Sequence, residues 1–224
     1  QSNEELQEFA HVASHDLKTP LRNIAGFIQL LKRRLANRLK QDEAEFIAYA
    51  VLGVKQMNAV IDDLLSMSKV SQYDLDKTPI PFEAVVQEVL EDMQLELAEK
   101  KAAVEVTDDL PTLHFSKTNA KRLFQNLISN AIKYQNGEQP QVQIHCHAEN
   151  GHWKFAVQDN GIGIPPGFEE KAFKMFERFH PKDHYKGTGI GLAICKKIVE
   201  NNHGKIWYTS EEHQGTTFYF TLPR

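Results

Sequence analysis

The chain has 224 residues, of which 41% are hydrophobic and 25% are charged, and its formal net charge is −4. This composition is typical of a globular protein with one or two domains. The charge argues against nucleic acid as a partner, because phosphate-backbone binding needs clustered Lys and Arg. No apolar stretch approaches the ~20 residues that a membrane span requires. Cys146 and Cys195 stand alone in the sequence, which disfavours a disulfide framework or a cysteine metal site and fits a reducing cytoplasm.

The N-terminal part is predicted to be all α-helical, with helices over residues 4–38 and 42–71. Apolar residues on both helices follow the alternating four-three spacing of a heptad seam. This seam consists of Leu17, Leu21, Ile24, Ile28, Leu31 and Leu35 on the first helix, and Ala50, Val54, Met57, Ile61, Leu64 and Ser68 on the second. Further apolar residues flank the seam, and pairing two hairpins into a four-helix bundle covers them best. We therefore predict a homodimer formed through residues 1–72.

Residues 73–82 are predicted to be a linker, and residues 83–224 a second domain. The second domain mixes helical and strand patterns, which indicates an α+β two-layer sandwich with three helices against one mixed sheet. Its helices are expected over residues 83–100, 116–134 and 189–201, with Ser116 as the N-cap of the middle one. Its strands are expected over residues 103–107, 112–115, 142–148, 153–158, 205–209 and 216–222.

Four motifs occur along the chain in a fixed order. Residues 14–21 read Ser-His-Asp-Leu-Lys-Thr-Pro-Leu, and residues 126–134 read Asn-Leu-Ile-Ser-Asn-Ala-Ile-Lys-Tyr. Residues 159–165 read Asp-Asn-Gly-Ile-Gly-Ile-Pro, and residues 187–192 read Gly-Thr-Gly-Ile-Gly-Leu. Together with Phe173, Phe176 and Phe179, which lie between the last two motifs, they resemble the phosphoacceptor, asparagine and two glycine boxes of a sensor histidine kinase. The first motif looks closest to the phytochrome-like and related hybrid kinases.

The first motif carries the candidate phosphoacceptor, His15. This residue lies about 200° around the helix from Leu17, so it is expected to face solvent. A neutral imidazole is abundant near pH 7 and can attack the γ-phosphorus of ATP. The resemblance implies that Asp16 accepts the other ring proton or holds the tautomer. Thr19, one turn further on the same face, would position water for dephosphorylating the partner.

The asparagine box is predicted to be a helix that presents Asn126, Asn130 and Lys133 on one face. The resemblance implies that Asn130 binds Mg²⁺ with the assistance of Asn126. Amide oxygens together with substrate phosphates suit this hard cation. Lys133 would lie near the phosphates, and Tyr134 would line the same pocket.

The two glycine boxes complete the predicted ATP site. In the family, the carboxylate that corresponds to Asp159 accepts a hydrogen bond from the adenine amino group. The glycines of the second box let backbone N–H groups at a helix N-terminus approach the phosphates closely. Phe173, Phe176 and Phe179, followed by residues 180–186, correspond to the family's mobile lid over ATP. The remaining expected nucleotide contacts are Gly161, Gly163, Ile164, Phe179, Gly187, Thr188, Gly189, Ile190, Gly191, Leu192 and Thr216.

The resemblance implies a kinase core that phosphorylates itself on His15 and passes the phosphoryl group to an aspartate of a response regulator. A sensor domain, and with it any membrane anchor, is expected upstream, while the core is expected in the cytoplasm. One alternative is a kinase-impaired phosphatase or scaffold of the same family. Another is a non-kinase ATPase of the same superfamily, as in gyrase and the heat-shock chaperones. That reading is disfavoured, because those enzymes need a carboxylate base where this chain has Asn126.

Overall fold

The computed structural model describes residues 2–35, 39–73, 76–177, 179 and 187–224, without the side chains of residues 2–13, 15, 71 and 72. The chain forms two compact units, Gln1–Lys69 and Val70–Arg224. Along the residues that the structure describes, no helix combines the length and the apolar character that crossing a lipid bilayer requires.

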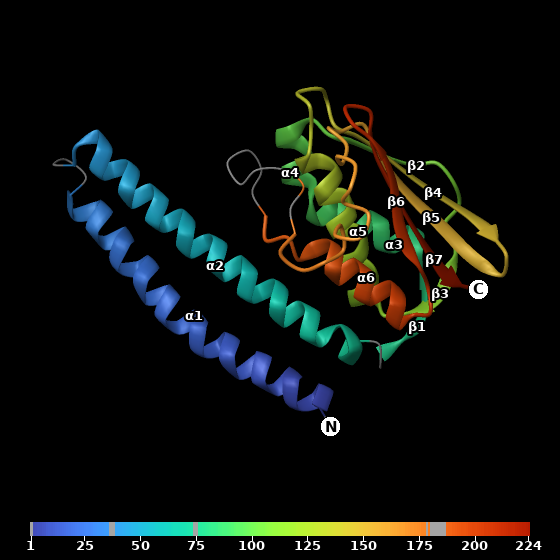
Figure 1. Cartoon of the computed structure of the whole chain (residues 1–224), viewed down its shortest axis with the longest axis horizontal. Coiled ribbons are helices and arrows are strands. Elements are labelled where there is room, and N and C mark those ends of the chain that lie inside the picture. Colours follow the sequence, from blue (N-terminus) through green and yellow to red (C-terminus); the bar gives the residue numbers. More distant parts are fainter. Residues whose placement is uncertain (1, 36–38, 74–75, 178, 180–186) are drawn as a thin grey trace. The chain divides into compact units, whose positions relative to one another are not determined.

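The first unit is the predicted helical hairpin. Helices α1 (Ser2–Leu35) and α2 (Gln41–Tyr73) run antiparallel, and α1 continues through Pro20 (Figure 1). Leu21, Val54 and Ile61 form a small core, against which Ala25 and Ile28 pack. Each helix therefore contributes alternate members of its heptad seam to the contact inside one hairpin.

Other members of the same seam remain exposed in the single hairpin. Leu17, Leu31 and Met57 are 53%, 52% and 48% exposed, and Ile24 is 46% exposed. Exposed apolar side chains that form a continuous stripe mark an interaction surface. A single hairpin thus buries only part of the apolar seam and leaves the rest exposed to solvent.

The second unit is an α+β domain, as predicted. Its helices are α3 (Phe82–Asp92), α4 (Gln94–Lys100), α5 (Lys117–Lys133) and α6 (Gly191–Asn201). Its strands are β1 (Thr78–Pro81), β2 (Ala103–Val106), β3 (Thr112–Phe115), β4 (Gln141–Glu149), β5 (His152–Asp159), β6 (Ile206–Glu211) and β7 (Gly215–Pro223). The main sheet has the order β2-β4-β5-β7-β6. It is mixed, because β2 runs parallel to β4 whereas the other neighbours are antiparallel.

Helices cover one face of this sheet (Figure 1). Between these layers lies an aromatic core. Helix α5 packs on β4 and β5, and α6 packs on β6 and β7. Phe155 on β5 stacks on Phe220 of β7 with ring centroids 4.6 Å apart. Phe82 and Phe124 meet Phe155 from the helical layer at 5.4 and 6.1 Å. This domain therefore builds a large core from its own chain.

Two details of the predicted domain are wrong. First, β1 and β3 form a separate two-stranded sheet, so residues 78–81 of the expected linker are a strand of the α/β unit. Second, the helix expected over residues 83–100 is divided at Met93, whose φ of −96° and ψ of 4° lie outside the helical region. The apolar spacing alone did not reveal this turn, because Met93 itself is buried and continues the pattern.

The start of α5 agrees with its prediction. Ser116 accepts a hydrogen bond from the backbone N–H of Asn119 at 3.3 Å and caps the helix. Asn119 in turn donates from its side chain to the carbonyl of Val70 at 3.0 Å. These bonds hold the first turn of α5, the helix that carries the asparagine box.

Candidate functional site

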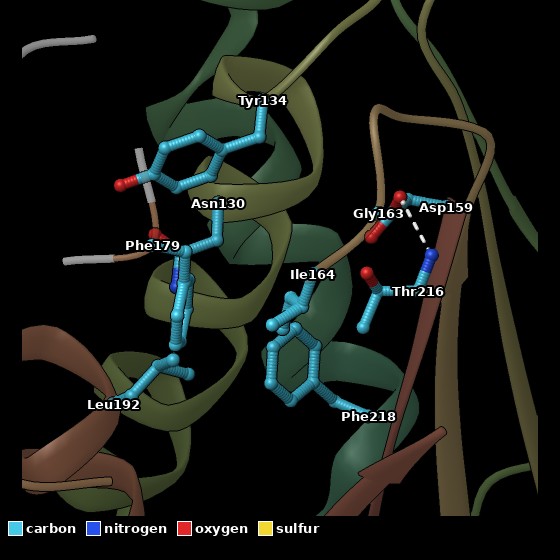
Figure 2. A pocket seen from close by; sticks show the side chains of 9 residues that line it. All are labelled: Asn130, Tyr134, Asp159, Gly163, Ile164, Phe179, Leu192, Thr216 and Phe218. Carbon is cyan, nitrogen blue, oxygen red and sulfur yellow. Dashed lines mark hydrogen bonds between the residues drawn. The ribbon is translucent and has the colours of Figure 1, made fainter. Parts of the chain in front are cut away.

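A pocket that is partly open to solvent lies in the α/β unit. Its walls come from α5, the loop after β5, the start of α6 and strand β7 (Figure 2). The lining residues are Asn130, Tyr134, Asp159, Gly163, Ile164, Phe179, Leu192, Thr216 and Phe218. All but Phe218 were predicted as nucleotide contacts. A mostly apolar pocket with a few convergent polar groups is typical of a small-molecule site.

Asp159 supplies the acidic group at one side of the pocket. Its Oδ1 accepts hydrogen bonds from the backbone N–H groups of Gly161 at 2.8 Å and Thr216 at 3.1 Å. Burial raises the pKa of this carboxyl to about 6, against the lowering effect of the two backbone bonds. Both hydrogen bonds that the described residues make to this carboxylate use Oδ1, so Oδ2 can accept one from a ligand.

The first glycine box allows close approach of backbone around Asp159. A Cβ on Gly161 would collide with the carbonyl of Tyr134, which also accepts the N–H of Ile162 at 3.0 Å. Gly163 has a φ of +74°, and a Cβ there would collide with the carbonyl of Glu211. These glycines therefore join the end of α5 and the end of β6 to the loop after β5. Gly163 lines the pocket, whereas Gly161 lies behind it.

Asn130 and Asn126 occupy different surroundings although they share a helix face. Asn130 lines the pocket. Asn126 donates from Nδ2 to the carbonyl of Gly191 at 3.3 Å. Because a carbonyl only accepts, this bond assigns the amide orientation and leaves Oδ1 of Asn126 as an oxygen ligand. Gly191 makes room for that oxygen, since a Cβ there would lie 3.2 Å from Oδ1.

Lys133 lies beside the second glycine box rather than in the pocket wall. Its Nζ is 2.9 Å from the Tyr134 hydroxyl and 4.3 Å from the centroid of that ring. A Cβ on Gly187 would collide with Nζ, so the ammonium group and this glycine are neighbours. A cation next to a glycine-rich segment suits phosphate binding.

The second glycine box also shapes the start of α6, which begins at Gly191 and not at the predicted Gly189. Gly189 has a φ of +75° and accepts the N–H of Phe176 at 2.9 Å, so it cannot be part of the helix. Thr188 accepts the N–H of Ile190 at 3.3 Å, and Ile190 is buried. These residues position the helix start and do not line the pocket.

The phenylalanine run has three different environments. Phe179 lines the pocket and meets Phe168 edge-on at 5.4 Å. Phe173 packs near Phe218 at 6.4 Å, whereas Phe176 is 56% exposed. The expected lid residues 180–186 lie outside the described residues.

Phe218 is the one residue in the pocket lining that the sequence motifs did not predict. It lies two positions after Thr216 on β7, where alternate residues are buried. Alternation along a strand would therefore have placed it on the same face as Thr216. Its ring and Ile164 form the apolar floor next to Thr216 (Figure 2).

The predicted phosphoacceptor residues lie on α1, in the first unit. Asp16 and Thr19 are exposed. The side chain of His15 is outside the described residues, so its predicted exposure stays a prediction.

Comparison with known protein families matches both units. Residues 5–72 match the His Kinase A (phospho-acceptor) domain, and residues 116–224 match the histidine kinase-, DNA gyrase B- and HSP90-like ATPase family. The chain belongs to the sensor histidine kinases. Within this family it has the two domains of a catalytic core, in the order that the four motifs predicted.

Relatives of the chain include cyanobacterial phytochromes. The chain is 45% identical over 222 residues to cyanobacterial phytochrome A of Nostoc sp., covering 99% of this chain and 29% of that protein. It is 42% identical to the phytochrome-like protein Cph1 of Synechocystis sp., covering 99% of this chain and 30% of that protein. This histidine kinase core thus spans less than a third of the length of these relatives. Both agree with the phytochrome-like character expected from the first motif.

A solved structure shares the fold. The structure of full-length ShkA in complex with AMPPNP superposes with a TM-score of 0.72 and 24% identity, covering 96% of this chain and 45% of that chain.

Proposed function

We propose that this core is an ATP-dependent protein-histidine kinase. Residues 1–72 are the dimerisation and phosphotransfer domain. The ATP-binding domain begins with β1 at Thr78, so only residues 73–77 of the expected linker 73–82 remain as the connection. The observation that carries the proposal is the pocket, in which Asn130 of α5, Asp159 at the end of β5 and Leu192 of α6 meet although they are far apart in the sequence.

ATP binds with its base beside Asp159. Oδ2 of Asp159 accepts a hydrogen bond from the adenine amino group, and Ile164, Phe179, Leu192 and Phe218 offer apolar surface to the ring. The phosphates lie toward Gly187, Lys133 and the N-terminus of α6. Backbone N–H groups and the helix dipole favour an anion at that end.

Asn130, with Asn126, is the protein's contribution to a Mg²⁺ site. The fit rests on the assigned amide of Asn126, whose Oδ1 is left as a ligand. Among the described residues, no group of three or more His, Cys, Asp or Glu side chains could hold a metal by itself. Substrate phosphates and water therefore complete the coordination, as is usual for Mg²⁺. The bound ion neutralises charge on the phosphates.

The transfer step uses the neutral imidazole of His15. One ring nitrogen attacks the γ-phosphorus, the bond from that phosphorus to the β–γ bridging oxygen breaks, and ADP leaves with the electron pair. Asp16 takes the proton of the other ring nitrogen or holds its tautomer. The phosphoryl group then passes to a carboxylate of a response-regulator receiver domain, and Thr19 positions water when that product is hydrolysed.

The working form is a homodimer. The exposed seam residues Leu17, Ile24, Leu31 and Met57 form the surface that a second hairpin covers. An upstream sensor domain acts on this bundle. The two free thiols and the use of ATP fit the cytoplasm.

The test is phosphorylation with ATP labelled on the γ-phosphate. His15→Ala should abolish acid-labile labelling and leave ATP affinity nearly intact, while His147→Ala, an exposed histidine on β4, serves as the matched control. Labelling that persists in His15→Ala would remove His15 from this role. If the wild type binds ATP without being labelled and dephosphorylates a regulator, the core is a phosphatase. Phosphate release that is unchanged in His15→Ala would indicate a non-kinase ATPase.

A further inference from the structure

Ser210 on β6 lies behind the pocket, and its hydroxyl group makes three short contacts. Its Oγ accepts the backbone N–H of Ile164 at 2.8 Å. The same oxygen is 2.9 Å from the carbonyl of Gly215 and 2.9 Å from Oγ1 of Thr216. Ile164 and Thr216 both line the pocket, whereas Ser210 does not.

The donors and acceptors in this cluster allow one consistent assignment. The carbonyl of Gly215 can only accept, and the N–H of Ile164 can only donate. The single hydroxyl proton of Ser210 is therefore directed to the carbonyl of Gly215. Without that proton, Oγ of Ser210 and the carbonyl oxygen of Gly215 would face each other at 2.9 Å with lone pairs only. The proton between Ser210 and Thr216 must then come from Thr216.

This assignment determines what Thr216 offers to a ligand. Its hydroxyl proton points back to Ser210, so Oγ1 presents only lone pairs to the pocket. The backbone N–H of Thr216 is bound to Oδ1 of Asp159 at 3.1 Å, which keeps the two side chains together. Figure 2 shows the Thr216 oxygen and the Asp159 carboxylate at the same side of the pocket.

We propose that Ser210 is a positioning residue for nucleotide selection: it holds Thr216 as an acceptor, so that this side of the pocket prefers a base with an exocyclic amino group to one with a carbonyl there. The proposal rests on the ATP site proposed above. Adenine offers amino hydrogens to Asp159 and Thr216, whereas the O6 of guanine would face two acceptors. Without Ser210, the Thr216 hydroxyl can turn and donate to that carbonyl.

The experiment compares the dissociation constants of ATP and GTP for the whole chain by calorimetry at pH 8. In Ser210→Ala, the ratio of the GTP constant to the ATP constant should fall roughly 3- to 10-fold, as expected for one altered hydrogen bond. Ser210→Thr keeps the hydroxyl and should keep the ratio. Thr209→Ala, one residue earlier on β6 and exposed, is the matched control.

Further outcomes separate the possible failures. In Thr216→Val, adding Ser210→Ala should leave the ratio unchanged, because the hydroxyl that Ser210 orients is gone. A Ser210→Ala variant that binds both nucleotides equally more weakly, with an unchanged ratio, has only a structural defect and overturns the proposal. If the wild type binds neither nucleotide, the proposed ATP site itself is wrong.

Discussion

The helical hairpin and the α/β unit differ in how completely they bury their apolar residues. The hairpin seam is partly buried, at Leu21, Val54 and Ile61, and partly exposed, at Leu17, Ile24 and Leu31. The aromatic core of the α/β unit is almost completely enclosed and consists of Phe82, Phe124, Phe155 and Phe220. The α/β unit closes its core with its own helices and sheet. Two helices alone cannot enclose a core of that kind. The hairpin therefore depends on a second copy, whereas the α/β unit does not.

This difference separates the two proposed chemical tasks. All residues that line the pocket belong to the self-sufficient unit, so ATP binding should not depend on dimerisation. The proposed acceptor His15 lies on the unit that needs its partner. Damage to either unit should therefore leave the other unit's property measurable, and the following experiments test that separation.

The largest effect is expected from Ile61→Glu in the hairpin. Ile61 is only 7% exposed, and a buried unpaired carboxylate is strongly unfavourable. The variant should give monomers or a molten hairpin while the α/β unit still binds ATP. Sedimentation at micromolar concentration measures the assembly, with Lys55→Glu on the exposed side of α2 as the control. An intact dimer of Ile61→Glu would show that the heptad seam is misassigned.

Leu31→Glu distinguishes the two halves of the seam. Leu31 is 52% exposed in the single hairpin, so this change should dissociate the dimer with less damage to the hairpin than Ile61→Glu causes. Circular dichroism of the two variants checks this difference. Equal loss of helix in both would mean that the hairpin has no structure of its own.

Phe155→Ala reverses the experiment by damaging the α/β unit. Phe155 is fully buried among Phe82, Phe124 and Phe220, and replacing such a ring by Ala costs about 3–5 kcal/mol. Calorimetry should show a lower melting transition for the α/β unit and weaker ATP binding, with the dimer retained. Leu95→Ala, at a position 77% exposed, should change neither. Loss of the dimer in Phe155→Ala would contradict the independence of the units.

Asp159→Asn should stabilise the nucleotide-free α/β unit at pH 8. The folded-state pKa of about 6 lies above the ordinary value of 3.8, so the protonated carboxyl is favoured by folding. Its contribution to stability is present below pH 4 and is lost as the pH rises through 6, up to about 3 kcal/mol. The difference in unfolding free energy between variant and wild type should therefore grow from pH 4.5 to pH 8. A difference that does not change with pH would exclude a raised pKa.

The same substitution should weaken ATP binding. Asn keeps the acceptor for Gly161 and Thr216 but replaces Oδ2 by an amide donor that faces the adenine amino group. The expected loss is about 1.5–3 kcal/mol of binding free energy, measured by calorimetry. Unchanged affinity would make Asp159 a turn residue only.

Gly163→Ala is expected to weaken ATP binding through the loop after β5. An Ala in the left-handed region costs about 1–2 kcal/mol, and here its Cβ would also collide with the carbonyl of Glu211. Gly167→Ala is the matched control, since Gly167 has a φ of +89° but open space around it. ATP affinity should fall in Gly163→Ala and hold in Gly167→Ala. Equal effects would show that backbone conformation, not close approach, requires glycine at position 163.

Much of this protein could be predicted from its sequence because many of its signals are local. Strand alternation and helix capping depend only on neighbouring residues. These local signals therefore sufficed to predict β3 and the start of α5 at Ser116. Eight of the nine pocket residues were predicted from the sequence, and six of them lie within the asparagine and glycine boxes. Heptad spacing likewise predicted the seam.

Only the tertiary structure decided which of these residues meet. It divided the seam between buried and exposed positions, separated β1 and β3 from the main sheet, and placed Asn126 against Gly191. It also brought Ser210 to Thr216 and Phe218 into the pocket. Ser210 and Thr216 meet across the β6–β7 hairpin, whereas the other contacts join segments distant in the chain. They depend on how the strands pair and on how closely the backbones approach, which glycines such as Gly161 and Gly163 permit.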